Sequence, residues 1–116
     1  MGLRALSARS VPAALYGRSG RLAGMYLALQ YDLVDDYLDR RGEFRDEHLG
    51  LARAAHARGQ LALAGAFTEP ADEALLVWST EDRAAVEAFA GSDPYVVNGL
   101  VRSWRVREWN VVVGGS

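Results

Sequence analysis

The chain has 116 residues, half of them hydrophobic and 24% charged, which indicates one globular domain and excludes a disordered or collagen-like chain. It contains no cysteine, so disulfides, thiolate metal sites and a cysteine nucleophile are excluded. The formal net charge is −2. No apolar run approaches the roughly 18 residues that a membrane-spanning helix needs, so we expect no membrane partner.

The charge is distributed unevenly along the chain. Residues 1–24 carry four arginines and no acidic residue, whereas residues 25–116 carry nine arginines and fifteen acidic residues, a balance of −6. Because phosphate binding needs clustered cations, we expect no nucleic-acid partner for the acidic part.

Residues 1–24 differ in composition from the rest, and we treat them as an N-terminal extension that is poorly ordered. Their content of Arg, Ala and Ser without acids is typical of a mitochondrial or chloroplast transit peptide. Alternatively, Met25 is the true start of the protein, because it stands directly before the first strand-like run. We expect a cytoplasmic location, or a mitochondrial one if the extension is a transit peptide.

The first half of the domain reads as a strand followed by a helix. The apolar run Met25–Tyr31 predicts a buried strand. Residues 35–41 fit a short helical turn that stops at Gly42. Residues 44–58 predict an amphipathic helix, and Gly59 fits the position just after its end. Its inward stripe, at spacings of three and four, comprises Phe44, His48, Leu51, Ala52 and Ala55.

Two further strands and a second helix follow. Residues 61–67 and 74–79 predict strands, joined by a loop that contains Pro70. Ser79 or Thr80 can then cap a helix over residues 81–90, which has acidic residues in its first turn.

The chain ends with a turn, a short helix and a long strand. Residues 91–94 predict a turn, in which Ser92 or Asp93 caps a helix over Pro94–Asn98. Residues 101–113 predict the last strand, and a change in its apolar alternation near Glu108 indicates either a bulge or a strand that leaves one sheet for that of a partner.

The element order β-α-β-β-α-β predicts a ferredoxin-like α+β fold, with a four-stranded antiparallel sheet and helices on one face, over residues 25–113. Large apolar residues occur at both alternating sets of strand positions and therefore on both faces of the sheet. The face without helices must then be packed against another protein surface. We expect a homodimer in which two such sheets pair, a dimeric α+β barrel.

His48 and Asp93 are the residues best suited to chemistry. His48 lies in the inward helix stripe, where it is either a core histidine bonded to a backbone carbonyl or a general base in a cleft. Asp93 is either a helix cap or the carboxylate that orients that base. His56 reads as a boundary residue, and its distance from His48, about 12 Å along a helix, makes a shared metal site unfavourable, so we expect no metal.

Three segments resemble the YCII-related (YciI-like) family: Arg45-Asp46-Glu47-His48-Leu49, Gly59-Gln60-Leu61 with Gly65, and Ser92-Asp93-Pro94-Tyr95 through Leu100. The resemblance covers residues 25–113 and implies a ferredoxin-like dimer. It also implies a pocket that contains His48 and Asp93, with Arg45 and Gly65 at further recurring positions.

The resemblance favours a cofactor-independent isomerase or lyase that acts on a small organic ligand. Asp93 would orient His48, which would transfer the proton. We expect Arg45 to hold a carboxylate or oxyanion, Ser92 to donate a hydrogen bond and Tyr95 to close the pocket. The alternative is a non-catalytic dimer that binds a small molecule or another protein, in which His48 and Asp93 only brace the pocket.

Overall fold

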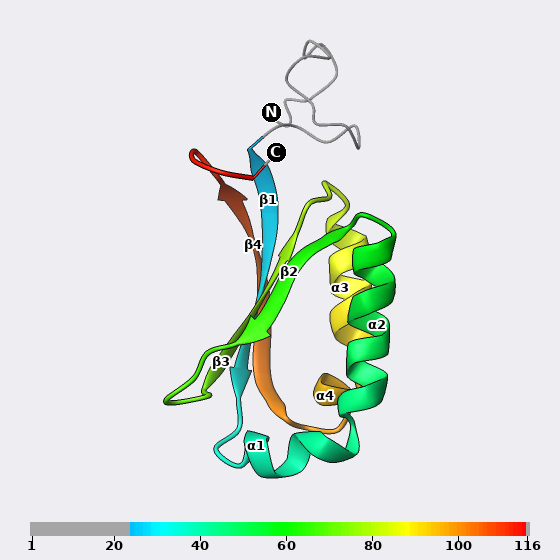
Figure 1. Ribbon diagram of the computed structural model, residues 1–116, viewed down its shortest axis with the longest axis vertical. Helices are drawn as coiled ribbons and strands as arrows, with labels where there is room; N and C mark the ends of the chain where they lie inside the picture. Colours follow the sequence, from blue (N-terminus) through cyan, green and yellow to red (C-terminus); the bar gives the residue numbers. More distant parts are fainter. Residues whose placement is uncertain (1–23, 116) are drawn as a thin grey trace.

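The computed structural model describes residues 24–115, so the extension predicted over residues 1–24 lies outside the described part except for Gly24. Four antiparallel strands form one sheet in the order β2-β3-β1-β4. Figure 1 shows that β1, the first strand of the domain, lies inside the sheet. The strands are β1 (Met25–Leu33), β2 (Leu61–Ala66), β3 (Glu73–Trp78) and β4 (Val101–Asn110).

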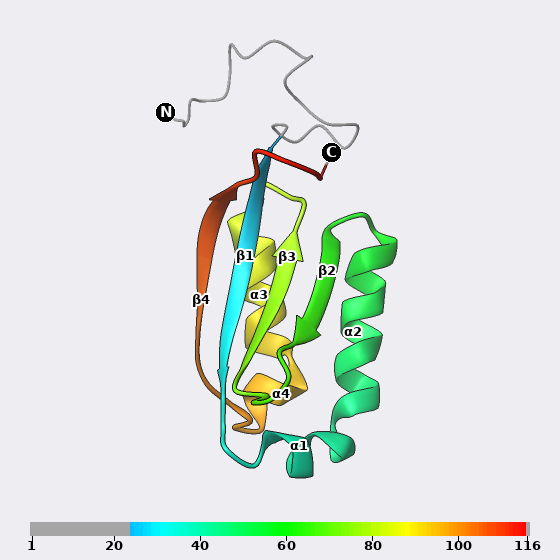
Figure 2. The same ribbon diagram turned by 60° about the vertical axis from the view of Figure 1, so that its left-hand side comes forward.

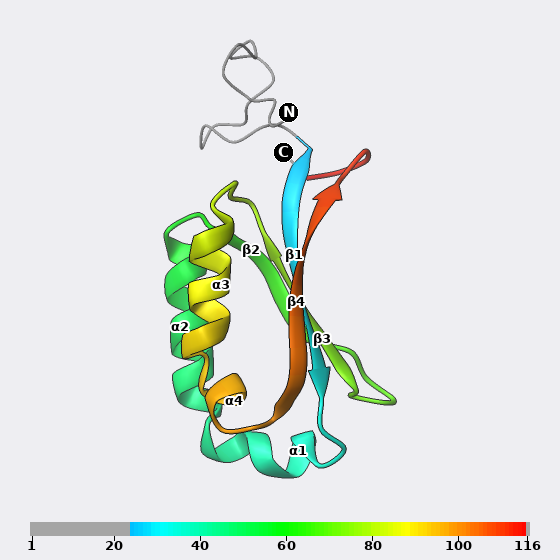
Figure 3. The same cartoon turned by 180° about the vertical axis from the view of Figure 1, so that it is seen from behind.

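Two longer helices lie side by side over one face of the sheet, as Figure 2 shows, which confirms the predicted α+β arrangement. Short helical segments close one end of the molecule, and Figure 3 shows them from behind, below the sheet. The long helices are α2 (Arg45–Ala57) and α3 (Arg83–Ser92); the short segments are α1 (Tyr37–Arg40), η2 (Arg41–Glu43) and α4 (Pro94–Val97).

The core fills the space between the sheet and the helices. Residues of β1 at every second position point into it, and the paired positions of β3 and β4 share that face. Leu29 lies opposite Leu76 on one side and Val106 on the other, and all three are buried. Ala55 and Val86 supply fully buried contacts from the two helices.

Several predicted boundaries differ from the structure, most clearly those of the helices. Helical structure continues past Gly42, because η2 carries the chain directly toward α2. Helix α3 begins later and ends later than predicted, because its cap is Asp82, whose side chain accepts a hydrogen bond from Ala85 N at 3.1 Å. Thr80 instead accepts from the backbone N–H of Asp82. The predicted turn over residues 91–94 is therefore partly helical, because α3 includes Ser92.

Strand β4 has no bulge at Glu108. Its pairing with β1 is continuous from Asn110 to Ser103, and the register shifts only at Asp32 and Leu33. Trp104 pairs with Tyr31 on the helix side, whereas Trp109 pairs with Tyr26 on the other face. The apparent change of phase arises because β4 carries a tryptophan on each face. Among residues 24–115, no helix has the length and apolar character needed to cross a membrane.

Candidate functional site

Asp93 lies at the junction of two helices and is completely buried. Its backbone N–H donates to Phe89 O at 2.9 Å and closes α3. Its side chain accepts the backbone N–H of Tyr95 at 3.0 Å and so caps α4, with Pro94 in the first position of that helix. The extended backbone of Asp93 turns the carboxylate inward, toward β1 and α2.

Two side chains from distant parts of the sequence complete the contacts of this carboxylate. Tyr31, on the inner face of β1, donates its hydroxyl to Oδ2 at 2.7 Å. His48, in the first turn of α2, lies with Nδ1 at 2.8 Å from Oδ1. A carboxylate can only accept, so Nδ1 of His48 carries the proton and donates it. The other ring nitrogen, Nε2, is left free to accept a proton.

Two contacts hold the imidazole ring of His48, one on a ring face and one at Nδ1. It stacks on the ring of Tyr95, with the centroids 3.9 Å apart and the planes 13° from parallel. Its side chain is 13% exposed, so it is reachable by a small molecule although it belongs to the core stripe of α2. The contact with Asp93 and the stacking on Tyr95 together fix the direction of Nε2.

His48 lines a cavity of about 140 Å³ between α2, the inner face of the sheet and the closed end of the molecule. Its walls are formed by small and aliphatic residues of α2, β2 and β3, whereas its polar groups come from β1, α1, η2, α2 and α4. The polar lining residues are Tyr31, Tyr37, Arg41, Arg45, His48 and Tyr95.

The two tyrosines nearest the histidine are held as neutral phenols. Burial, followed by the charge of Asp93 and their hydrogen bond, raises the pKa of Tyr31 far above its usual range. Burial and the neighbouring Tyr37 raise the pKa of Tyr95 to about 12, against the opposing charges of Arg45 and Arg41. Both hydroxyls therefore remain donors at any pH near neutrality.

The comparisons with known proteins agree with this architecture. The family model of the YCII-related domain matches residues 25–110. The chain belongs to the YCII-related family. No curated protein matches this YCII-related chain in sequence.

Two solved structures resemble the fold. One is the 5-chloro-2-hydroxyhydroquinone dehydrochlorinase (TftG) of Burkholderia phenoliruptrix, solved in complex with 2,5-dihydroxybenzoquinone, at 18% identity and a TM-score of 0.58. The match covers 73% of this chain and 92% of that one. The other, Rv0793 from Mycobacterium tuberculosis, has 16% identity and a TM-score of 0.47, over 79% of this chain and 98% of that one.

Most of the residues singled out in the sequence meet at this cavity of the YCII-related domain. His48, Arg45, Tyr95 and Gly65 line it. Asp93 does not line the cavity itself and is linked to it through His48, Tyr31 and Tyr95. A Cβ atom added at Gly65 would meet nothing within 4 Å, so space does not explain the glycine.

Ser92 is the predicted site residue that the structure does not bring to the cavity. It is exposed at the end of α3, and its hydroxyl donates back to Ala88 O at 3.0 Å. The physical reason is that α3 extends two residues further than expected, so the serine hydroxyl completes the helix end instead of facing a ligand.

Three cavity residues were not found by sequence reasoning. Tyr31 was assigned only to a buried strand, although the alternation of β1 places it on the inner face. Tyr37 and Arg41 lie in the short segment predicted as a helical turn, and nothing in their local pattern indicates that the turn closes the cavity.

His56 takes no part in the site. Its Nδ1–H donates to Leu61 O at 2.7 Å, which ties the exposed end of α2 to β2. In the described part of the chain, no three acidic, histidine or cysteine side chains are grouped so that they could hold a metal ion.

Proposed function

We propose that this YCII-related protein catalyses proton transfer on a small organic substrate, with His48 as the base and Asp93 as its orienting partner. The observation that carries the proposal is the 2.8 Å contact between His48 Nδ1 and Asp93 Oδ1, which leaves Nε2 as the basic atom beside the cavity. The buried carboxylate fixes the tautomer and stabilises the imidazolium that forms when Nε2 accepts a proton.

When Nε2 removes a proton from a carbon atom of the substrate, an electron pair stays behind, and two reactions can follow. If it returns to a different atom of the same molecule, the reaction is an isomerisation. If a leaving group departs with the electron pair, the reaction is an elimination and the enzyme is a lyase. Neither outcome needs a cofactor. The Burkholderia neighbour is a dehydrochlorinase, a name that describes the elimination of hydrogen chloride, and its ligand has a single ring.

Substrate binding in this proposal involves the residues around His48. Arg45 reaches the cavity from the first turn of α2, and Tyr95 offers both a flat ring and a hydroxyl that stays protonated. The backbone of Gly65 lies in the cavity wall on β2, and its pairing with Leu75 puts the position of its missing side chain on the other face of the sheet. These positions would surround a molecule whose acidic carbon faces Nε2.

The alternative is a binding protein without catalysis. One observation favours it: both oxygens of Asp93 are fully used by donors within the protein, which is also what a purely structural carboxylate requires. In that case His48 would brace the cavity and its Nε2 would transfer no proton.

The test is deuterium exchange at carbon. A panel of small cyclic ketones, lactones and hydroxylated ring acids is incubated with the protein in D₂O, and loss of C–H signals is followed by NMR. We expect exchange with wild type, and a decrease of about 100-fold or more in His48→Gln, because general base catalysis contributes on that scale.

The matched control is His56→Gln, which removes the other histidine of the same helix and leaves the cavity intact. Asp93→Asn should lower the exchange rate and change the tautomer of His48 in ¹⁵N NMR spectra. Equal exchange in wild type and His48→Gln would contradict the proposal and favour the binding protein.

We also propose that the protein is a homodimer in the cytoplasm, with the sheet faces that lack helices packed against each other. In the described residues this face, which we call the open sheet face, presents Tyr26, Ala28, Gln30, Leu63, Leu75, Val77, Arg107 and Trp109. Leu63 is 71% and Trp109 45% exposed in one chain, which supports a protein cover.

A further inference from the structure

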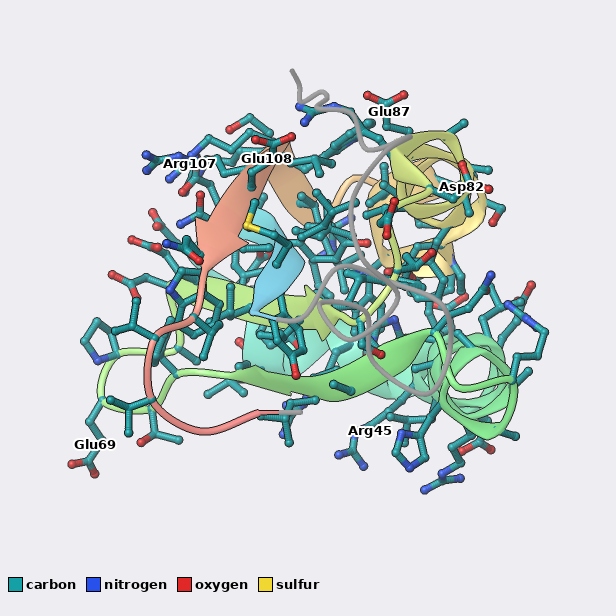
Figure 4. All side chains as sticks on the ribbon, turned by 90° about the horizontal axis from the view of Figure 1, so that it is seen from above. Arg45, Glu69, Asp82, Glu87, Arg107 and Glu108 are labelled. Carbon is teal, nitrogen blue, oxygen red and sulfur yellow. The ribbon has the colours of Figure 1, made fainter. Side chains whose placement is uncertain are left out.

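Two arginines of the cavity have no acidic partner among residues 24–115. Arg41, in η2, and Arg45, at the start of α2, both line the cavity. The guanidinium of Arg41 lies 5.5 Å from the centre of the Tyr37 ring, so it packs on an aromatic face and not on a carboxylate. Figure 4 labels Arg45 at the margin of the molecule between α2 and β2, where it is exposed at the rim of the cavity that it lines.

Arg41 and Arg45 form no ion pair within the described chain, as is also true of the exposed Arg53, Arg58 and Arg107, but they are the two that line the cavity. The arginine ion pairs found in residues 24–115 involve Arg40, Arg83, Arg102 and Arg105. No aspartate or glutamate lines the cavity. Asp93, the carboxylate behind His48, has no exposed surface and is bonded to Tyr31, His48 and Tyr95. Two positive charges without an acidic partner among residues 24–115 therefore line the cavity that contains His48.

The size and the walls of the cavity restrict the ligand further. A cavity of about 150 Å³ with apolar walls accommodates benzene, so about 140 Å³ corresponds to one ring with few substituents. The apolar walls come from Leu33, Leu49, Ala52, Ala64 and Leu76. A ligand that fits them has an apolar ring body and a charged group at the arginine side.

We propose that the cavity binds a ring-sized organic carboxylate, with the carboxylate held by Arg41 and Arg45 and the ring directed toward His48 and Tyr95. Guanidinium groups bind carboxylates in a planar, two-point geometry that a neutral or cationic group cannot form. This inference rests on the proposed function for the role of His48, and it adds the charge and size class of the substrate.

The test compares three probes of one shape: benzoate, its neutral isostere benzamide and its cationic isostere benzamidine. Each is titrated into the full chain, and amide shifts at the cavity wall, for example at Gly65 and Ala66, report binding. We expect benzoate to bind at least about tenfold more tightly than benzamide, and benzamidine not to bind, because charge-assisted hydrogen bonds are the stronger class.

Arg41→Gln and Arg45→Gln should each weaken benzoate binding about tenfold while leaving benzamide binding unchanged. Arg53→Gln is the matched control, because Arg53 is exposed on the same helix and does not line the cavity. Equal binding of benzoate and benzamide, loss of both probes in Arg45→Gln, or no benzoate shift at about 10 mM would each overturn the inference.

The failure of this inference can be distinguished from the failure of the proposed function. His48→Gln keeps both arginines, so it should still bind benzoate while losing any exchange activity. Benzoate binding in a protein that exchanges no proton would support the anion site and contradict the catalytic proposal. Exchange activity in a protein that does not prefer benzoate would support the catalytic proposal and contradict the anion site.

Discussion

Asp93 is an ionisable residue without any exposed surface, and its surroundings explain how that is tolerated. A buried carboxylate is strongly destabilising unless hydrogen bonds replace its lost hydration. Here three donors do so: the hydroxyl of Tyr31, the Nδ1–H of His48 and the backbone N–H of Tyr95. The donors belong to β1, α2 and α4, so one side chain fixes three elements relative to one another.

The contribution of the Tyr31 hydroxyl can be measured directly. Tyr31→Phe keeps the ring but leaves Oδ2 of Asp93 without its 2.7 Å donor. Because the bond is buried and its acceptor is charged, we expect the free energy of unfolding to fall by about 1.5–3 kcal/mol in urea titrations. Rotation of the carboxylate would also broaden the His48 resonances.

The control for Tyr31→Phe is Ser103→Ala, which removes a hydroxyl that donates to Asp32 Oδ2 at 2.8 Å on the exposed surface. That loss should change the free energy of unfolding by less than about 0.5 kcal/mol, because water replaces the donor. Similar losses in the two variants would contradict the importance of burial at Asp93.

The raised pKa of Tyr95 predicts how the free energy of unfolding changes at alkaline pH. Its pKa is raised to about 12 by burial and by Tyr37, whereas tyrosine in the unfolded chain titrates near 10. Between these values the unfolded state binds fewer protons than the folded state, so stability falls as pH rises from about 10 to 12 and is fully present below that window.

In urea unfolding between pH 8 and pH 11, Tyr95→Phe should therefore lose less stability with rising pH than wild type does. Tyr31 acts in the same direction and remains in both proteins. The difference in absorbance at 295 nm between wild type and variant should show a phenol that ionises with a midpoint near 12. A midpoint near 10 would show that Tyr95 is not shielded.

At the scale of elements, helix periodicity identified the catalytic candidate on α2. The stripe at spacings of three and four placed His48 among residues that the structure buries fully or partly, such as Ala52 and Ala55. The Asp-Pro step likewise predicted the cap of α4, where proline follows the capping side chain. Both signals are local, because they depend on residues within one turn of each other.

The errors occurred where distant contacts decide the local structure. The phase of β4 was misjudged because tryptophans face both sides of the sheet, and only the pairing with β1 shows which face each occupies. Ser92 was placed at the site because a Gly-Ser-Asp-Pro run resembles a turn, whereas α3 packs far enough along the sheet to include it. Tyr31 and Arg41 approach the cavity from segments whose local pattern contains no sign of it.

At the scale of the whole molecule, the open sheet face stands out because none of the described helices packs on it. A shallow depression of about 270 Å³ lies on it between β3, β1 and β4, lined in part by Ala28, Gln30, Leu75 and Trp109. Oε1 of Gln30 is buried there and finds no donor among the described residues. Figure 4 labels Arg107 on the side of β4 that faces away from α2 and α3, where it could reach a second chain.

The dimer proposal predicts the effect of one charge on this face. Leu75, half-buried on β3, would lie inside the interface, so Leu75→Arg should convert a dimer into a folded monomer in sedimentation experiments because an unpaired charge cannot be buried there. Leu38→Arg is the control: Leu38 is 56% exposed on α1, away from the sheet, and its substitution should leave the dimer intact. A wild-type protein that sediments as a monomer at about 100 μM would contradict the proposal, since homodimer interfaces that cover a whole sheet face associate well below that concentration.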